Sequence, residues 1–347
     1  MTSPPPNTPN VAIVILNWNG WKDTVECLAS LMNSVYQDFG IILVDNGSDG
    51  DSLSQINSWI EAYASLNGIK PSLHREKSET LQNGDPRPVS KIHLITLQEN
   101  LGFAKGANVG IRYATANGFK YVMLLNNDTT LHPQCLGLLW DTCQKNPQFK
   151  ILTPLICYHA EPDKVWMFGG SLTYTGRRKY HYGDQPKSQI KESIKTVTFV
   201  SGCALWTSAT TFQEIGLLTE AFFFGEEDYD FSLRLKQAGY RIGAVRDALV
   251  YHKIGRANKQ IFSQDRLPYA FIGYLNRILD RKRHSPSLWH WRLWRITVLI
   301  YVIPKLIIIH RYPIKRIGQF LRLLLDYSNR LEGVSRHTFF DIKNRLG

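Results

Sequence analysis

The sequence has few cysteines and no long hydrophobic runs. None of its five cysteines stands in a C-x-x-C pair or at a His/Cys spacing typical of zinc. An odd, scattered set in a chain of 347 residues indicates reduced thiols that pack as small apolar side chains. The apolar stretch 296–309 is interrupted by Pro304 and is shorter than the roughly 20 residues of a membrane-spanning helix. The first residues contain neither a basic nor an apolar segment, so we expect no secretory signal and a cytoplasmic body.

Net positive charge is nearly absent from the first 276 residues. The chain carries +12, but residues 277–347 hold 15 Lys and Arg against 4 Asp and Glu, which leaves +1 for the rest. This distribution argues against a nucleic-acid groove across the body. The basic segment also contains Trp289, Trp291 and Trp294 beside the apolar stretch 296–309. Such a composition is typical of an amphipathic helix in peripheral contact with an anionic membrane. The alternative is a helical hairpin packed on the body or on a second subunit.

Short β-branched runs alternate with helical patterns through the first 150 residues. This alternation is typical of right-handed βαβ units and predicts an α/β fold with a mainly parallel central sheet flanked by helices. The predicted strands are 11–16, 41–44, 92–96 and 121–125, and the helical patterns cover 25–32, 52–66 and 103–114. Beyond residue 150, short strands and glycine-rich turns indicate a mixed or antiparallel extension. We therefore expect a disordered tail (1–10), an α/β domain (11–255) with a surface insertion (67–90), and a basic, Trp-rich helical extension (256–347).

The fourth predicted strand, 121–125, ends abruptly in Asn126-Asn127-Asp128. In open α/β sheets, ligands bind at the carboxyl edge, where this strand end places its oxygen atoms. One carboxylate with neighbouring carbonyl oxygens suits a hard divalent cation that keeps its other positions for phosphate oxygens. The alternative is an Asn/Asp turn in which Asp128, before Thr129 and Thr130, only starts the next helix.

The first two predicted strands also end in small polar residues. One continues into Asn17-Trp18-Asn19-Gly20 and the other into Asp45-Asn46-Gly47-Ser48. A carboxylate such as Asp45 can accept the imide N–H of uracil or thymine, and Trp18 offers an aromatic face for stacking. Each segment alone is also explained as an ordinary strand–helix turn with a capping side chain.

A segment with two glycines, 99–108, leads into the third helical pattern. Glycines at a helix start let the backbone approach a ligand, and the helix start favours anions. Lys105 could add a cation, with Asn108 one turn further along. The segment is not a Walker A loop, because no G-K-[ST] closes it, and by itself the signal is weak.

Carboxylates crowd together in Glu226-Glu227-Asp228-Tyr229-Asp230. Crowded carboxylates raise one another's pKa, which is the arrangement that a general base uses. Acidic residues in a first helical turn are the common structural alternative. Asp230 and Arg234 are expected to pair on the helix surface. His252 ends a later short strand and could be a ligand of a cation held by an aspartate.

These segments carry a resemblance, because they occur in the order seen in family 2 glycosyltransferases. The matching motifs are Ile-Leu-Asn-Trp-Asn-Gly, Val-Asp-Asn-Gly-Ser, Asn-Leu-Gly-Phe-Ala-x-Gly-x-Asn, Asn-Asn-Asp, Glu-Asp-x-Asp-x-x-x-Arg and Tyr-His. Over roughly residues 11–255 the chain resembles an inverting enzyme of the GT-A fold, closest to bacterial rhamnosyltransferase-like members.

The resemblance implies roles for particular residues. Asp45 would contact the nucleobase, and Asp128 would bind Mg²⁺ or Mn²⁺ on the diphosphate of the sugar nucleotide. Asp228 would be the base, and His252 would lie at the metal or the diphosphate. The remaining nucleotide-sugar contacts would come from Asn17, Trp18, Asn19, Asn100, Lys105, Asn108, Asn127 and Glu227. The family's D-x-D is Asn126-x-Asp128 here, and because Asn126 is neutral we expect modest metal affinity.

We therefore expect transfer of a sugar from a nucleoside-diphosphate donor, dTDP- or UDP-linked, to an acceptor hydroxyl with inversion. The basic tail favours a lipid-linked or glycan acceptor, in bacterial cell-surface polysaccharide or glycolipid synthesis at the inner face of the plasma membrane. Segment 199–206 is expected on the acceptor side. A sugar nucleotidyltransferase would carry a Gly-rich, Arg/Lys-bearing signature after the first strand, which residues 17–20 lack. A non-catalytic nucleotide-sugar-binding module would not need both Asp128 and Asp228.

Overall fold

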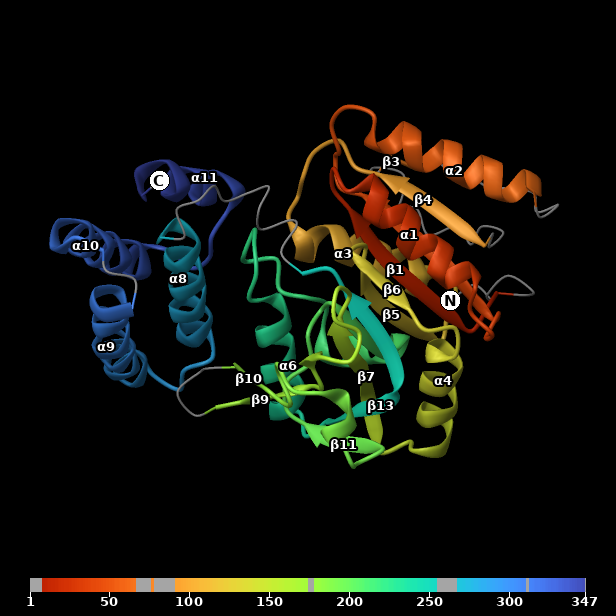
Figure 1. Ribbon diagram of the computed structural model, residues 1–347. Coiled ribbons are helices and arrows are strands. Elements are labelled where there is room, and N and C mark those ends of the chain that lie inside the picture. The colour runs from red at the N-terminus through yellow and green to blue at the C-terminus, as the bar shows by residue number, and fades with distance from the viewer. Residues whose placement is uncertain are drawn as a thin grey trace. The chain divides into compact units, whose positions relative to one another are not determined.

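The computed structural model describes residues 8–66, 76–77, 91–173, 178–254, 267–309 and 312–346. The chain forms two compact units (Figure 1). The sheet unit comprises Met1–Leu172, Arg178–Thr219 and Glu227–Arg256, and the helical unit comprises Thr173–Arg177, Glu220–Glu226 and Ala257–Gly347. Of the predicted tail 1–10, residues 1–7 lie outside the described residues, as does the predicted insertion 67–90 except Glu76–Lys77.

Parallel strands form the N-terminal half of the sheet, as the alternation in the sequence predicts. Strand β1 pairs with β2 on one side and β5 on the other, and β4 joins β2, all in parallel. The elements are β1 (Val11–Asn17), α1 (Trp21–Met32), β2 (Phe39–Asp45), α2 (Ser52–Leu66), β3 (Glu76–Lys77), β4 (Ile92–Thr96), α3 (Phe103–Ala116) and β5 (Tyr121–Asn126). The strands are continuous apolar runs because helices cover both of their faces.

Alternate side chains of β1 enter two different cores. Ile13 and Ile15 lie in the hydrophobic cluster that includes Leu28 of α1. Val14 points to the opposite face and lies in the cluster that includes Ile111 of α3. A Cβ atom at Gly110 would stand 2.5 Å from Cγ1 of Val14, so the backbone of α3 rests directly on the strand. This close packing fixes the loop that precedes α3 at the carboxyl edge of the sheet.

Beyond β5 the sheet becomes mixed, which confirms the expected mixed or antiparallel extension. The strand order is β11-β13-β7-β12-β5-β1-β2-β4-β3, with β12 antiparallel to both β5 and β7 and β13 parallel to β7. The strands are β6 (Thr129–Leu131), β7 (Phe149–Tyr158), β8 (Val165–Met167), β9 (Gly170–Leu172), β10 (Arg178–Tyr180), β11 (Ile194–Val197), β12 (Ala204–Ser208) and β13 (Arg241–His252). The helices are α4 (Cys135–Lys145), η2 (Lys187–Gln189), α5 (Ala209–Ile215) and α6 (Glu227–Gln237).

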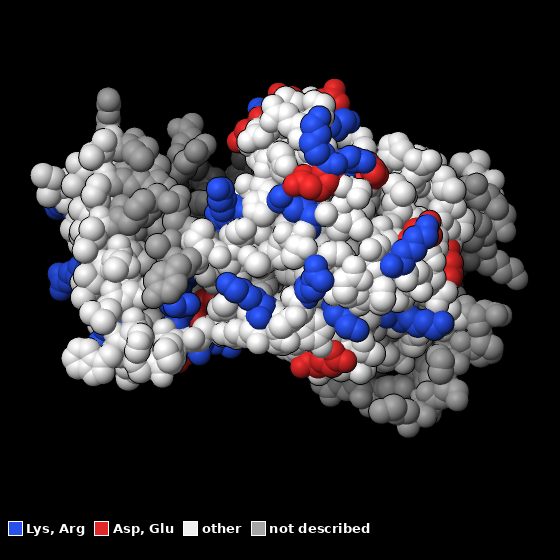
Figure 2. Space-filling model, turned by 90° about the horizontal axis from the view of Figure 1, so that it is seen from below, with Lys and Arg blue, Asp and Glu red and all other residues white. Residues whose placement is uncertain are grey.

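The cysteines agree with the expectation from composition. All five thiols are free, four of them are buried, and burial raises the pKa of Cys27 to about 12. On the face seen in Figure 2, the Lys and Arg side chains of the described residues are scattered singly, with acidic side chains among them. That face therefore carries no continuous basic groove among the described residues.

The helical unit has a core of its own. It contains α8 (Leu267–Arg283), α9 (Leu288–Pro304), a π-helical turn (Lys305–Ile309), α10 (Ile314–Arg330) and α11 (Arg336–Leu346). The core includes Phe271, Phe320 and Phe339. The segment 220–226 belongs to this unit because Phe222 forms a β-bridge with Val334.

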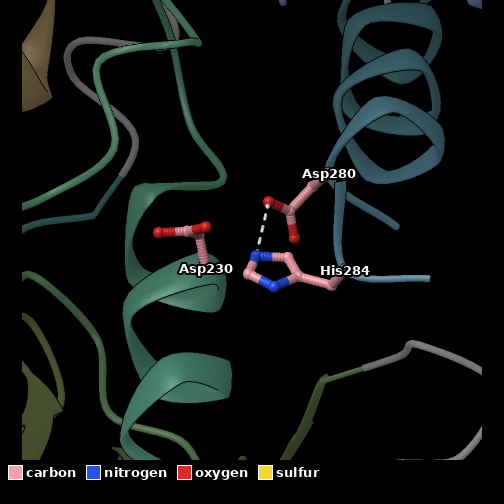
Figure 3. Close-up of side chains that lie close together, drawn as sticks. All are labelled: Asp230, Asp280 and His284. Carbon is pink, nitrogen blue, oxygen red and sulfur yellow. Dashed lines mark ion pairs between the residues drawn. The ribbon is translucent and has the colours of Figure 1, made fainter. Parts of the chain in front are cut away.

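The end of α8 carries an ion pair within the helical unit. Nε2 of His284 lies 3.6 Å from a carboxylate oxygen of Asp280, one helical turn earlier, and Asp280 is fully buried (Figure 3). Among the described helices, none is both long and apolar enough to cross a bilayer.

Candidate active site

Polar residues at the carboxyl ends of β1, β2 and β5 lie together at one edge of the sheet. The parallel register places Asn17 opposite Asp45, and it places Leu16 opposite Asn126, two residues before Asp128. The three predicted strand ends therefore meet where ligands bind in open α/β sheets.

The carboxylate of Asp45 is held by a buried hydrogen-bond network. The amide of Asn17 donates to Oδ1 of Asp45 at 2.6 Å. The hydroxyl of Ser48 donates to the same oxygen at 2.7 Å, and its backbone N–H donates to Oδ2 at 3.1 Å. An ionised carboxylate offers about four acceptor positions. These three bonds leave one acceptor position of Asp45 unused, in a residue that is only 2% exposed.

Asn17 serves as a support for Asp45. It is fully buried, and its Oδ1 accepts a hydrogen bond of 2.8 Å from the hydroxyl of Thr24. The predicted contact of its side chain with a nucleotide does not fit this position. Trp18 and Asn19 are partly exposed in the same loop. The side chain of Asn19 accepts from the backbone N–H of Asp49 at 2.8 Å, which ties the first two strand-end loops together.

The loop before α3 docks against Asn46. Asn46 donates to Oδ1 of Asn100 at 3.0 Å and accepts from the backbone N–H of Leu101 at 3.0 Å. Gly47 allows this approach, because its φ is +66° and a Cβ there would lie 2.4 Å from the backbone carbon of Glu99.

The two polar residues of α3 differ in position. Lys105 is exposed and available to a ligand. Asn108 is fully buried, and its amide donates to the carbonyl of Leu218 at 2.9 Å and accepts from its N–H at 3.1 Å. The predicted ligand role of Asn108 does not fit a side chain engaged in the core, and the structure gives it the role of anchoring the backbone at Leu218.

Asp128 and His252 come together at the predicted metal position. The short strand β6 pairs with the end of β13, so Thr129 lies opposite His252. Nε2 of His252 lies 3.1 Å from Oδ1 of Asp128, with only 8% and 14% of the two side chains exposed. Residues 129–131 form a strand and do not begin a helix. The neighbouring Asn127 donates to the hydroxyl of Thr24 at 2.9 Å.

The protonation of His252 depends on its neighbours. Burial alone lowers the pKa of this imidazole, but Cys203 and the carboxylate of Asp128 raise it, with a net result of about 10. Nδ1 of His252 is buried without a hydrogen-bond partner among the described residues. A carboxylate oxygen beside an imidazole nitrogen fits Mg²⁺ or Mn²⁺ with further positions left for phosphate oxygens, provided that the imidazole is deprotonated.

The predicted base lies at the start of α6 and has a partner that the sequence did not reveal. Nη1 of Arg178, on β10, lies 3.2 Å from Oδ1 of Asp228, and the two side chains are 26% and 11% exposed. Glu227 is also buried in this turn. The only sequence signal for Arg178 is its place in a short basic run, which by itself indicates a solvated turn.

Asp230 and Arg234 pair, but the expectation that they do so on the helix surface is wrong. Asp230, labelled on α6 in Figure 3, is only 2% exposed, and it lies 2.7 Å from Nη2 of Arg234. The guanidinium also donates to the carbonyls of Ile215 and Leu217. The pair therefore fixes the turn after α5 against α6.

A row of aromatic rings runs from His252 at the predicted metal position to Arg178, the partner of the predicted base Asp228. The ring of Trp166 meets His252 edge-on at 4.7 Å and Tyr180 at 5.6 Å. Tyr180 stacks on Phe199 at 6.0 Å, and the guanidinium of Arg178 lies 5.5 Å from the centre of the Phe199 ring. Trp166 and Tyr180 are partly exposed, whereas Phe199 is fully buried. Phe199, from the expected acceptor segment 199–206, thus supports this row from within.

Comparisons with known proteins agree with this geometry. The family model described as Glycosyl transferase family 2 matches residues 12–205, and the model described as Glycosyl transferase family group 2 matches residues 121–314. The dTDP-rhamnosyl transferase RfbF of Shigella flexneri is 26% identical over 207 residues, which cover 58% of this chain and 67% of the relative. The low-salt glycan biosynthesis hexosyltransferase Agl10 of Haloferax volcanii is 26% identical over 215 residues, or 61% of this chain and 66% of the relative.

Two solved structures share the fold. GalNAc-T7 with UDP, GalNAc and Mn²⁺ superposes with a TM-score of 0.53 at 14% identity, over 84% of this chain and 54% of that protein. The mannosyltransferase PcManGT from Pyrobaculum calidifontis, in complex with GDP-Man and Mn²⁺, gives 0.52 at 10% identity, over 99% and 89%. At such identities the likeness concerns the fold, which is that of the GT-A glycosyltransferases. With more than half of its length matched by the family model, this chain is a glycosyltransferase that belongs to family 2.

Proposed function

We propose that the protein transfers a sugar from a nucleoside-diphosphate donor to an acceptor hydroxyl, with inversion at the anomeric carbon and with Mg²⁺ or Mn²⁺ as cofactor. The observation that carries this proposal is the meeting of Asp128 and His252 at the sheet edge that also holds Asp45. Asp128 and His252 would hold the cation, which would supply charge neutralisation at the departing diphosphate. With only one carboxylate in this pair, the donor's phosphate oxygens would complete the site.

The nucleobase end of the donor site is formed by Asp45 and Trp18. The remaining acceptor position on Asp45 suits the N3–H of thymine or uracil, so the donor is a dTDP- or UDP-sugar. RfbF, by its name, uses a dTDP-linked sugar, and the GalNAc-T7 structure contains UDP. Asn19, Asn100, Lys105 and Asn127 contribute further contacts from the adjoining loops.

Asp228 accepts the proton in this scheme. As the acceptor oxygen attacks the anomeric carbon, its O–H bond breaks, the proton passes to the carboxylate of Asp228, and the bond to the diphosphate oxygen breaks on the opposite face. Glu227, buried in the same first turn of α6, is assigned a contact with the donor sugar. Arg178, 3.2 Å from Asp228, is a positioning residue that holds the carboxylate in place.

The acceptor approaches along the aromatic row of Trp166 and Tyr180, which spans the distance from His252 to Arg178. Aromatic faces with a few polar groups are typical of small-molecule sites, and they suit the apolar faces of sugar rings. We place the acceptor among lipid-linked or glycan hydroxyls of bacterial cell-surface polysaccharide or glycolipid synthesis. The enzyme would act in the cytoplasm at the inner face of the plasma membrane.

A donor screen tests this function. dTDP-rhamnose, UDP-glucose, UDP-N-acetylglucosamine and GDP-mannose are incubated with the full chain, with Mn²⁺ or with EDTA, and release of the nucleoside diphosphate is followed. We expect Mn²⁺-dependent release from a dTDP- or UDP-sugar and loss of donor binding in Asp45→Ala. Equal release in EDTA would contradict the metal role. Pyrophosphate release from a nucleoside triphosphate and a sugar 1-phosphate would instead identify a nucleotidyltransferase.

A further inference from the structure

Helix α9 is apolar on the side that faces the core of the helical unit. Trp291 is 3% exposed and Val302 is fully buried, and Val298 packs against the same core. The indole N–H of Trp291 donates to the carbonyl of Ile278 on α8 at 2.9 Å. At about 100° per residue, these three side chains point to one side of the helix. Packing against the core of the helical unit therefore buries this side of α9 and does not involve the opposite side.

The opposite side of α9 is also apolar, and it is exposed. Trp289, Leu293, Ile296 and Ile300 are 72%, 62%, 52% and 66% exposed. Their spacing of four, three and four residues places them within an arc of about 60° on the helix. We call these four side chains the outer face of α9. A helix with apolar residues all round is normally buried on every side, so the outer face lacks the polar residues expected at a protein–water boundary.

The net charge of residues 277–347 indicates which kind of partner binds the outer face of α9. Residues 277–347 carry +11, so two copies facing each other here would bring together like charges. An anionic surface is complementary to the same charge. Arg292 is exposed at the margin of the outer face, with its guanidinium 5.7 Å from the centre of the Trp289 ring. Tryptophan and arginine beside an apolar stripe are the side chains that occupy the boundary between headgroups and acyl chains.

We propose that the outer face of α9 inserts into the headgroup region of an anionic bilayer, with the helix lying in the plane of the membrane. The face extends for roughly 16 Å along the helix, from Trp289 to Ile300. None of the described helices is long and apolar enough to span a bilayer, which agrees with a helix that lies on the membrane. Two of the three tryptophans are thereby separated, with Trp291 in the protein core and Trp289 on the proposed membrane face.

The test is flotation of the full chain with vesicles of phosphatidylcholine alone or with 30% phosphatidylglycerol. The variant Leu293→Gln/Ile296→Gln/Ile300→Gln removes the apolar side chains without changing the net charge. The matched control, Val35→Gln/Leu66→Gln, removes two apolar side chains of the sheet unit that are 74% and 86% exposed. Circular dichroism and thermal unfolding show whether each variant is folded as the wild type.

We expect the wild type to bind the anionic vesicles, with affinity falling as salt is raised, and to bind neutral vesicles at least tenfold more weakly. The outer-face variant should lose at least tenfold in affinity, and the control should stay within twofold of the wild type. Fluorescence of Trp289 should shift to shorter wavelength on binding, a signal absent from Trp289→Phe.

A folded outer-face variant that binds vesicles as tightly as the wild type would overturn the proposal. So would a wild-type dimer that dissociates in this variant, since a second copy would then cover the face. The membrane proposal is independent of sugar transfer. If no donor releases nucleotide with wild type or variant, the proposed function fails while the vesicle result stands.

Discussion

Replacing Asp128 by asparagine tests both the metal position and the electrostatics around His252. The substitution keeps the size of the side chain but removes the negative charge 3.1 Å from Nε2 of His252. Burial, which lowers the pKa of this imidazole, would then act without the opposing carboxylate. An opposite charge at such a distance typically moves a pKa by about 1–3 units, which corresponds to about 1.4–4 kcal/mol. The pKa of His252 should therefore fall from about 10 by that amount.

The measurement is an NMR titration of the His252 imidazole protons in the metal-free protein. Asp49→Asn is the matched control, because it removes an exposed carboxylate from the neighbouring β2–α2 loop. It should leave the His252 titration unchanged. A His252 pKa that is the same in Asp128→Asn and the wild type would refute the assigned ion pair.

The pH dependence of the free energy of unfolding should also change when the charge of Asp128 is removed. The folded-state pKa of His252 lies above its unfolded value of about 6.5. The stabilisation from Asp128 is therefore complete below about pH 6.5 and is lost as the pH rises toward 10. In Asp128→Asn, urea unfolding should show a smaller loss of stability over this range. Mn²⁺ binding measured by calorimetry with the nucleotide present should weaken strongly, and turnover should fall by about 10²–10³-fold.

Further predictions concern the base, the nucleobase loop and the thiols. Asp228→Asn should retain donor binding while transfer falls by about 10²–10⁴-fold, and wild-type transfer by this variant would place the base elsewhere. Arg178→Met should lower kcat with little change in donor KM, and Arg178→Lys should retain part of the kcat that Arg178→Met loses. In the Asp228→Asn background neither substitution should lower kcat further. Additive losses in kcat would show that Arg178 does not act through Asp228. Asp45→Ala should raise the donor KM and also lower the melting temperature, because Asn17 and Ser48 lose the buried carboxylate to which they donate. Gly47→Ala should destabilise the protein by about 1–3 kcal/mol in urea unfolding, since its φ is +66°. Cys27 should react with a thiol reagent at pH 8 only as fast as the protein unfolds, because burial raises its pKa to about 12.

The elements that the sequence predicts well are those with a single physical cause. The helix 52–66 and the strand 92–96 agree with the structure residue for residue. Strands covered on both faces are continuous apolar runs, and the polar residue at which the run stops marks the carboxyl edge. The gathering of Asn17, Asp45 and Asp128 at that edge follows from parallel pairing, so it was predictable without coordinates. The chemical roles assigned to these residues stay predictions.

The features that the sequence did not predict depend on contacts between distant segments. The local sequence pattern does not predict that Arg178 lies beside Asp228, or that the side chain of Asn108 is hydrogen-bonded to the backbone of Leu218. Helix α9 shows a different limit. Its two opposite faces are both apolar, so periodicity does not decide whether Trp289 or Trp291 faces the core. Only the packing against α8 distinguishes them.

The pairing of Asp128 with His252 also has a consequence for how the protein is made. The residues are 124 positions apart, and they meet only when the end of β13 adds to β6 and β7. A ribosome that has completed the parallel strands β1, β2, β4 and β5 has produced the carboxyl edge of the sheet with only one of these two side chains. Pairing between segments so far apart is a late and slow step of folding. Chains interrupted before residue 252 should therefore lack the joint site, so that the proposed binding of Mn²⁺ by both residues would report a completed sheet.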